Sequence, residues 1–179
     1  MQRYGYGAAI LATVMLVSAP AVAGEATIHR DTYGVPHIFA DTPVEAAYAL
    51  GYAQAEDRLE DIYRNARMAV GRMAEVFGPE HVERDIIMRT VRNAEVCQEK
   101  WPEAKPVIRD MCAAFVEGIE AFEAEHPEAR PACALELAPW HCAAIGRAMV
   151  LSWPLGLLMD ELKEKPENPG FGSKGWAAA

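Results

Sequence analysis

The sequence predicts an α-rich α+β fold in which a short N-terminal β-hairpin precedes about four helices. Two observations carry this prediction. Two β-prone runs flank a glycine-containing turn, and four later stretches repeat apolar residues at helical spacing. A chain of 179 residues with 51% hydrophobic and 24% charged side chains is long enough to bury one globular core. The formal net charge of -9 and the lack of a dense Lys/Arg cluster argue against nucleic acid as a partner.

Residues 1–23 have the organisation of a secretory signal peptide. Arg3 supplies a modest positive start, residues 8–17 are mostly apolar, and Ala21-Val22-Ala23 fits the small-x-small pattern that signal peptidase accepts. We therefore expect cleavage before Gly24 and a periplasmic or secreted product that has no membrane association once the leader is removed. A membrane-anchored helix is the alternative, and the apolar run is too short for a comfortable span.

The hairpin is predicted from residues 26–31 and 35–40, which are joined by Thr32-Tyr33-Gly34. Pro36 cannot donate a backbone hydrogen bond, so it belongs at a strand start or on an edge. An isolated two-stranded hairpin is marginal in water. No further strand is predicted in this sequence. The hairpin and the helices together therefore indicate one layer of a fold that requires a partner sheet.

The first helix is predicted to follow the hairpin at once. Thr42 is a plausible N-cap, Pro43 occupies the first helical position, and Glu45 completes a capping box. Apolar residues then recur at close to helical spacing as far as Phe77, and Gly78-Pro79 ends the element: Leu59, Ile62, Ala66, Val70, Met73 and Phe77. Glycine weakens a helix interior, so Gly51 and Gly71 predict close packing against a neighbour.

Three more helices are expected, over about 80–100, from about 103 or 106 to 124, and from about Trp140 onward. The last of these carries an apolar ridge and contains Pro154, which predicts a kink: Ile145, Met149, Trp153, Leu157 and Leu158. Residues 163–172 are rich in charge, proline and glycine, which predicts an exposed linker.

Four cysteines in an exported protein allow three disulfide pairings. Cys133 and Cys142 flank a short proline-containing segment, which favours a 133–142 bond together with one between Cys97 and Cys112. The alternative is that Cys112 is a buried small apolar residue on a helix face. No CxxC spacing is present and the five histidines are scattered, so the sequence predicts no metal site and no cofactor.

Three stretches of the sequence are similar to those of a known family. They are residues 28–40 (IHRDTYGVPHIFA), residues 51–59 (GYAQAEDRL) with 71–78 (GRMAEVFG), and residues 172–177 (GSKGWA). In this order they resemble the penicillin and cephalosporin acylases, N-terminal-nucleophile amide hydrolases made as one precursor and cut into α and β chains. The short distance from Trp140 to Ser173 looks more like the glutaryl-cephalosporin acylases than the penicillin G type.

The resemblance implies a division of the chain. Residues 24–162 would be the helical α-chain region, 163–172 a linker, and 173–179 the start of a truncated β chain. The fold would be a fragment of an N-terminal-nucleophile αββα fold, completed only with the missing β chain as heterodimer partner. Cutting the Gly172–Ser173 bond would make Ser173 the nucleophile, with its own free α-amine as base. Lys174 departs from the family, which usually has asparagine there.

The function that the resemblance implies is hydrolysis of a small-molecule amide, such as an antibiotic side chain. Cleavage of acyl-homoserine lactones is the alternative within the family, and an inactive fragment or a non-catalytic helical binding module is the alternative outside it. Asp160 and Glu161 lie near a position where some relatives hold calcium, although a solvated helix face is the simpler interpretation of both. The 179-residue chain alone is expected to be inactive and poorly soluble.

Overall fold

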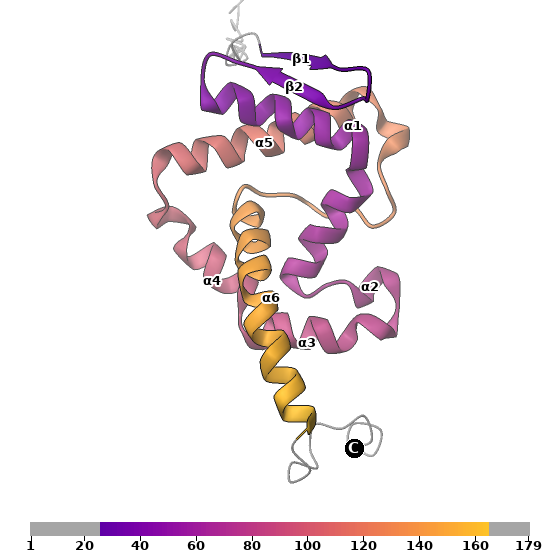
Figure 1. Cartoon of the computed structure of the whole chain (residues 1–179), viewed down its shortest axis with the longest axis vertical. Coiled ribbons are helices and arrows are strands. Elements are labelled where there is room, and N and C mark those ends of the chain that lie inside the picture. The colour runs from indigo at the N-terminus through magenta and orange to yellow at the C-terminus, as the bar shows by residue number, and fades with distance from the viewer. Residues whose placement is uncertain (1–25, 165–179) are drawn as a thin grey trace, which may run out of the picture.

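The computed structural model describes residues 26–164, which form a helix-rich body with one antiparallel hairpin. Figure 1 shows the hairpin lying across the first half of the long helix α1, with α5 beside it and α3 and α4 at the other end of the body. The last helix, α6, starts within the body and projects beyond it. The predicted α-rich α+β fold class is confirmed.

The hairpin pairs β1 (Thr27–Arg30) with β2 (Pro36–Phe39), in the register Ile28↔Ile38 and Arg30↔Pro36. Pro36 is the first residue of its strand, where its missing N–H costs no ladder bond. Gly34 takes a φ of +81° in the turn, a conformation that glycine adopts without steric cost. The strands alternate exposed and half-buried residues, because one face of the hairpin covers α1 and the other faces solvent.

Helix α1 (Pro43–Val70) begins with the predicted capping box, in which the Thr42 hydroxyl accepts from the Glu45 N–H. It bends at Arg58, whose backbone leaves the helical region at φ -153° and ψ 48°. The predicted continuation to Phe77 is wrong. Gly71 adopts a left-handed φ of 67° and ends the helix, because its N–H turns back to the carbonyls of Arg67 and Met68. The short helix α2 (Ala74–Phe77) follows.

The helix predicted over residues 80–100 is divided in the structure. Its parts are the 3₁₀ turn η1 (Pro79–His81), α3 (Val82–Thr90) and α4 (Asn93–Lys100). The break falls at Arg92, which has a left-handed φ of 51°. Neither glycine nor proline marks this position, so the sequence carries no local signal for the turn. The turn is fixed instead by Asn93, whose side chain is fully buried between other helices.

The last two long helices follow the prediction closely. Helix α5 (Pro106–Glu125) is preceded by the turn η2 (Trp101–Glu103) and followed by η3 (Pro127–Ala129). Helix α6 (Trp140–Glu164) includes Pro154 without ending there.

The core lies where α1 crosses α5 and where α4 and α6 pack on α1. Glycines permit the α1–α5 crossing, since a Cβ at Gly51 would overlap the backbone carbonyl of Phe115 and one at Gly118 would overlap that of Tyr48. At Gly71, a Cβ would lie 2.8 Å from the Asp85 carbonyl oxygen. The prediction of close packing at Gly51 and Gly71 is therefore confirmed.

Candidate functional site

The predicted cleavage site and nucleophile, Gly172 and Ser173, lie outside the described residues, as does Lys174. The structure describes the helix that leads toward them. Helix α6 runs to Glu164 and is the last described element before the predicted junction. The site is therefore built outward from α6.

The base of α6 is fixed by a buried polar contact with two other helices. Asn93, which is 0% exposed at the start of α4, donates from Nδ2 to the Ala144 carbonyl at 2.9 Å and to the Ala69 carbonyl at 2.8 Å. Its Oδ1 accepts from Nη1 of Arg147 on α6 at 2.6 Å. A buried amide with both ends satisfied is specific as well as stabilising, because any shift of α6 would leave buried polar atoms unpaired.

His141 holds the first turn of α6. Its Nδ1 lies 3.0 Å from the Ala138 backbone nitrogen, and its ring stacks on Trp140 with centroids 3.8 Å apart. Burial lowers the pKa of His141, which favours the neutral ring. Both rings line an open hollow of about 450 Å³, with Arg72 and Glu136 among the other lining residues. Arg72 is already paired with Glu75, its Nε lying 2.9 Å from Oε1.

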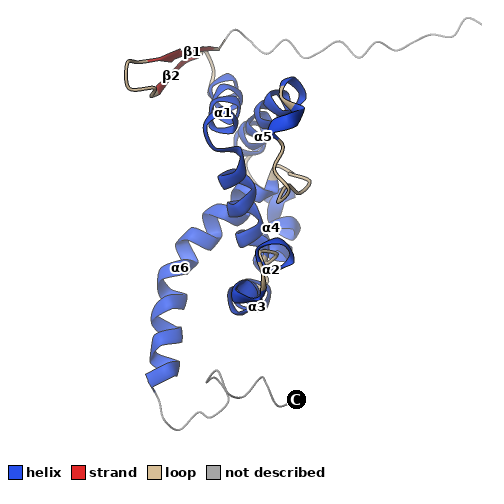
Figure 2. Ribbon diagram, turned by 90° about the vertical axis from the view of Figure 1, so that its right-hand side faces the viewer, coloured by secondary structure: helices blue, strands red, loops and turns tan. Residues whose placement is uncertain are grey.

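The outer part of α6 presents apolar side chains to solvent. We call these residues the α6 apolar face: Met149, Val150, Trp153, Leu157 and Leu158. Val150 is 76% exposed and Trp153 is 74% exposed. From residue 149 to residue 161 no side chain is fully buried, and Leu155 packs only partly against the cluster that contains Ala69 and Met88. Figure 2 shows the end of α6 standing away from the other helices. The predicted ridge exists, and beyond Ile145 its residues are between 49% and 74% exposed in the described part of the chain.

By length and composition, Trp140–Glu161 could also cross a membrane, with a mean hydropathy of 1.5 over its most apolar window. An apolar helix that is covered by a second protein layer passes the same test. The base of α6 is buried against the body, as expected for a helix of a globular assembly. Pro154 within α6 fits that interpretation as well as it fits a membrane-spanning helix.

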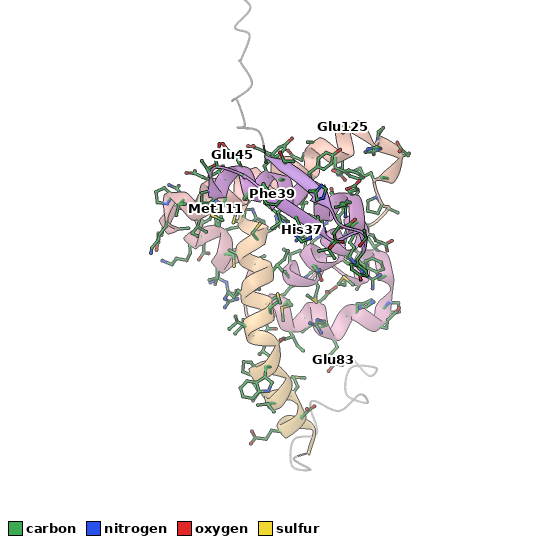
Figure 3. The ribbon with its side chains drawn as sticks, turned by 45° about the horizontal axis from the view of Figure 1, so that its top comes forward. His37, Phe39, Glu45, Glu83, Met111 and Glu125 are labelled. Carbon is green, nitrogen blue, oxygen red and sulfur yellow. The ribbon has the colours of Figure 1, made fainter. Side chains whose placement is uncertain are left out.

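The hairpin presents a second uncovered surface. Its outer residues include His29, His37 and Phe39, and Phe39 is 63% exposed (Figure 3). Tyr33 in the turn is 91% exposed. We call these four residues the hairpin outer face.

Ion pairs tie the hairpin to α1. Arg30 on β1 binds the carboxylates of Glu56 and Asp57, with its Nη2 2.9 Å from Asp57 Oδ1. Asp57 therefore takes part in an ion pair with the hairpin, while its neighbour Arg58 points to Asp61 instead.

The turn of the hairpin is held by the Asp31 carboxylate, which accepts hydrogen bonds from the Val35 N–H and lies against the His37 ring. The hydrogen bonds with His37 and Val35 lower the pKa of the Asp31 carboxyl.

The weak metal candidates Asp160 and Glu161 are both exposed near the end of α6. Among residues 26–164, no three His, Cys, Asp or Glu side chains are grouped to hold a metal ion. A cation at Asp160 and Glu161 would therefore need ligands from beyond the described residues.

The predicted disulfide pairing, 133–142 with 97–112, is wrong. The structure has Cys133 buried in the cluster around Tyr63 and Ile119, whereas Cys97 is buried in the separate cluster around Met88 and Ala144. Cys142 contacts Cys112 instead of Cys133. Short sequence separation misled the prediction, because Cys133 packs in the cluster around Tyr63 while Cys142, in the first turn of α6, lies against Cys112.

Sequence reasoning also missed the buried polar groups that shape the body. Tyr63 donates to Glu123 at 2.7 Å, and Arg130 completes the contact at 2.6 Å from the other carboxylate oxygen. Arg67, which is 6% exposed, donates to the carbonyls of Cys133 and Ala134. Arg67 is a charged residue on the apolar stripe of α1, and this position was the one available sequence signal of its burial. The described residues thus form a packed body with two uncovered faces, the α6 apolar face and the hairpin outer face.

Comparison with known proteins gives a consistent result. Residues 25–177 match the family model described as penicillin amidase. The chain is 34% identical over 149 residues to penicillin acylase 2 proenzyme from Pseudomonas sp. (strain SE83), covering 80% of this chain and 18% of that protein. It is 33% identical over 101 residues to the acyl-homoserine lactone acylase QuiP of Pseudomonas aeruginosa, covering 56% of this chain and 12% of that protein.

Among solved structures, a chain of the thermostable penicillin G acylase from Alcaligenes faecalis matches with a TM-score of 0.61 and 26% identity. The match covers 86% of this chain and 88% of that one, so the two are of similar length. The chain spans less than a fifth of the length of the two curated relatives.

Proposed function

The chain belongs to the penicillin amidase family, and on that premise we propose that it is the α-chain region of a self-processing amide hydrolase. Residues 24–162 form the α-chain region, 163–172 the linker, and Ser173 the first residue of a β chain. The observation that carries the proposal is the extent of the family match, which runs to residue 177 and so passes through the Gly172–Ser173 bond. The word "proenzyme" in the name of one relative supports processing.

The chemistry follows from what a serine needs in order to attack an amide. Its hydroxyl is a weak nucleophile until a base takes its proton. A terminal α-amine has a pKa of about 8 and is partly neutral at physiological pH, so cutting the Gly172–Ser173 bond would give Ser173 its own base. Ser173 Oγ would then attack the amide carbonyl, the amine would leave with a proton, and water would hydrolyse the acyl-enzyme.

A β chain is the partner that the two uncovered faces fit. Helix α6 and the hairpin, which carry the α6 apolar face and the hairpin outer face, lie toward the same side of the body in Figure 2. A partner that brings a sheet could extend the hairpin and bury the α6 apolar face, each buried large apolar side chain contributing about 1.5–3 kcal/mol. The same partner would supply the oxyanion donors, worth ~3–4 kcal/mol each in the transition state.

The substrate is a linear amide, and two classes are supported. Penicillin acylase 2 proenzyme matches over the larger share of the chain, which favours the acyl side chain of a β-lactam antibiotic. The similarity to QuiP favours an acyl-homoserine lactone as the second candidate. With residues 1–23 as a signal peptide, the reaction would take place in the periplasm or outside the cell.

The test is expression of the gene with the sequence that follows the codon for Ala179. We expect N-terminal sequencing to find a product that begins at Ser173, and the mature protein to release the amine from an acylated β-lactam or from an acyl-homoserine lactone. Assaying both substrates decides between the two classes.

The matched control replaces another serine of the same chain. Ser173→Ala should abolish both processing and turnover, whereas Ser152→Ala, on the exposed surface of α6, should leave both unchanged. A stop codon directly after Ala179, an intact Gly172–Ser173 bond, or full turnover in the Ser173→Ala variant would each overturn the proposal.

A further inference from the structure

Two of the four thiols meet across the packing of α5 on α6. Cys112 lies on α5 and Cys142 in the first turn of α6, and their side chains are in hydrogen-bonding contact. Both are half-buried rather than sealed in the core. A disulfide needs the two Cβ atoms within about 4.5 Å, so two thiols already in contact need little backbone movement to be joined.

One turn further along each of the two helices, both contribute a side chain to the same hydrophobic cluster. Phe115 follows Cys112 by three residues and Ile145 follows Cys142 by three, and both pack against the cluster that contains Ile119 and Phe122. Residues three apart share a helix face, so the faces that carry the thiols are the faces that meet. The contact of the thiols is therefore a consequence of core packing.

The base of α6 cannot easily slide away from this position. Arg147, on the next turn, binds the buried side chain of Asn93, and Asn93 also binds the Ala144 carbonyl. The other two cysteines are placed differently, since Cys97 is 7% exposed and Cys133 is 3% exposed in separate clusters. The chain thus separates its cysteines into one adjacent, half-buried pair and two isolated buried thiols.

We propose that Cys112 and Cys142 form a disulfide that ties α5 to the base of α6. The oxidant is a disulfide donor, such as a thiol–disulfide oxidoreductase or oxidised glutathione. The Cys112 thiolate attacks the donor disulfide and releases one donor thiol. The Cys142 thiolate then attacks the mixed disulfide and releases the second. Two protein thiols are oxidised to one disulfide, and their two protons and two electrons pass to the donor, which is reduced to two thiols.

The order of the two steps follows from the environment of Cys142. Burial, and then the neighbouring Cys112, raise the pKa of Cys142, so its thiolate is scarce and we place the first attack on Cys112. Once the mixed disulfide exists, Cys142 attacks within the same molecule, and its proximity offsets the low thiolate fraction.

The bond would fix the orientation of the base of α6 relative to α5. It joins the base of the helix to α5, while the α6 apolar face beyond residue 149 remains free to meet a partner. The inference does not rest on the proposed enzymatic function, because it needs only the two contacting thiols and an oxidant.

The test uses the full 179-residue chain, purified reduced, incubated with oxidised glutathione and then alkylated in denaturant. Cleavage after glutamate places the four cysteines in four different peptides, spanning residues 96–99, 104–117, 129–136 and 137–161. We expect a linked pair of 104–117 with 137–161 and alkylated thiols at Cys97 and Cys133. Reduction should lower the Tm by about 10 °C, because the bond closes a loop of about 30 residues.

Cys112→Ser and Cys142→Ser should each abolish the link, and Cys133→Ala is the matched control that should retain it. Alkylation in denaturant reports the link even in a variant whose stability is reduced. Four alkylated thiols after oxidation, or a link that includes Cys97 or Cys133, would overturn the proposal.

Discussion

The α1–α5 crossing and the outer half of α6 have the same kind of sequence and opposite surroundings. At the crossing, Ala53 is 1% exposed and Ile119 is 0% exposed, and Gly51 brings the two backbones close together. On α6, a ridge with equally regular spacing leaves Trp153 74% exposed. The comparison teaches that helical periodicity identifies a face to be covered, while only tertiary packing identifies what covers it.

The largest effect is expected at the buried contact that holds the base of α6 to α1 and α4. Asn93→Ala removes the amide that binds the Ala69 and Ala144 carbonyls and leaves the Arg147 guanidinium without its Asn93 partner. Leaving several buried polar groups unpaired should lower the free energy of unfolding by about 3–4 kcal/mol. Urea unfolding followed by circular dichroism measures the loss.

Asn65→Ala is the control for that change, since Asn65 lies on the exposed side of α1. It should alter the free energy of unfolding by less than about 0.5 kcal/mol. Equal effects of the two substitutions would mean that Asn93 does not hold α6 to the body.

The next effect tests the crossing itself. In Gly51→Ala the new Cβ would overlap the Phe115 backbone carbonyl, and backbone cannot move aside as a flexible side chain can. We expect a loss of about 2–3 kcal/mol from overpacking, measured by thermal unfolding.

Gly146→Ala makes the same substitution on α6, where a Cβ would meet nothing within 4 Å. Alanine is the better helix former, so this variant should gain up to about 1 kcal/mol. A neutral Gly51→Ala would show that the two helices are less closely packed than the structure has them.

The contrast also explains how much the sequence could predict. The capping box at Thr42, the hairpin with Pro36 at a strand start, and helix α5 each follow from local signals, and each is confirmed. The break at Arg92 depends on packing between helices, so no local pattern reveals it. The buried role of Arg67 depends on carbonyl groups distant in sequence, and its charge on the apolar stripe of α1 is the one local signal of it. The cysteine pairing failed for the same reason, because spacing along the chain does not report proximity across helices.

For the candidate site, the resemblance led to the family, and the comparisons confirm it. The roles of Gly172 and Ser173 stay predictions, because those residues lie outside the described part of the chain. The sequence did predict the apolar ridge on α6, but its exposure required the fold.

A smaller effect is expected from pH, at the base of α6. Burial lowers the pKa of His141, so below the ordinary histidine pKa of about 6.5 the unfolded chain takes up a proton that the folded chain resists. Stability should therefore fall as the pH drops through this range. His141→Asn cannot be protonated, and its Tm should fall less steeply between pH 7.5 and pH 5.5. Parallel slopes for the two proteins would contradict the role of His141.

The smallest effect on stability should come from substitutions in the α6 apolar face. This small effect distinguishes the face from the packed body, where substitutions are expected to be costly. Trp153→Gln removes a large side chain that is 74% exposed, so the free energy of unfolding should change by less than about 0.5 kcal/mol. Self-association of the chain, measured by sedimentation velocity, should nevertheless decrease, because an exposed apolar patch drives it. Ser152→Gln, one residue away and outside the face, should leave association unchanged. If Trp153→Gln destabilised the chain as strongly as Gly51→Ala, the outer half of α6 would have to be packed against the body, and the contrast between the two regions would fail.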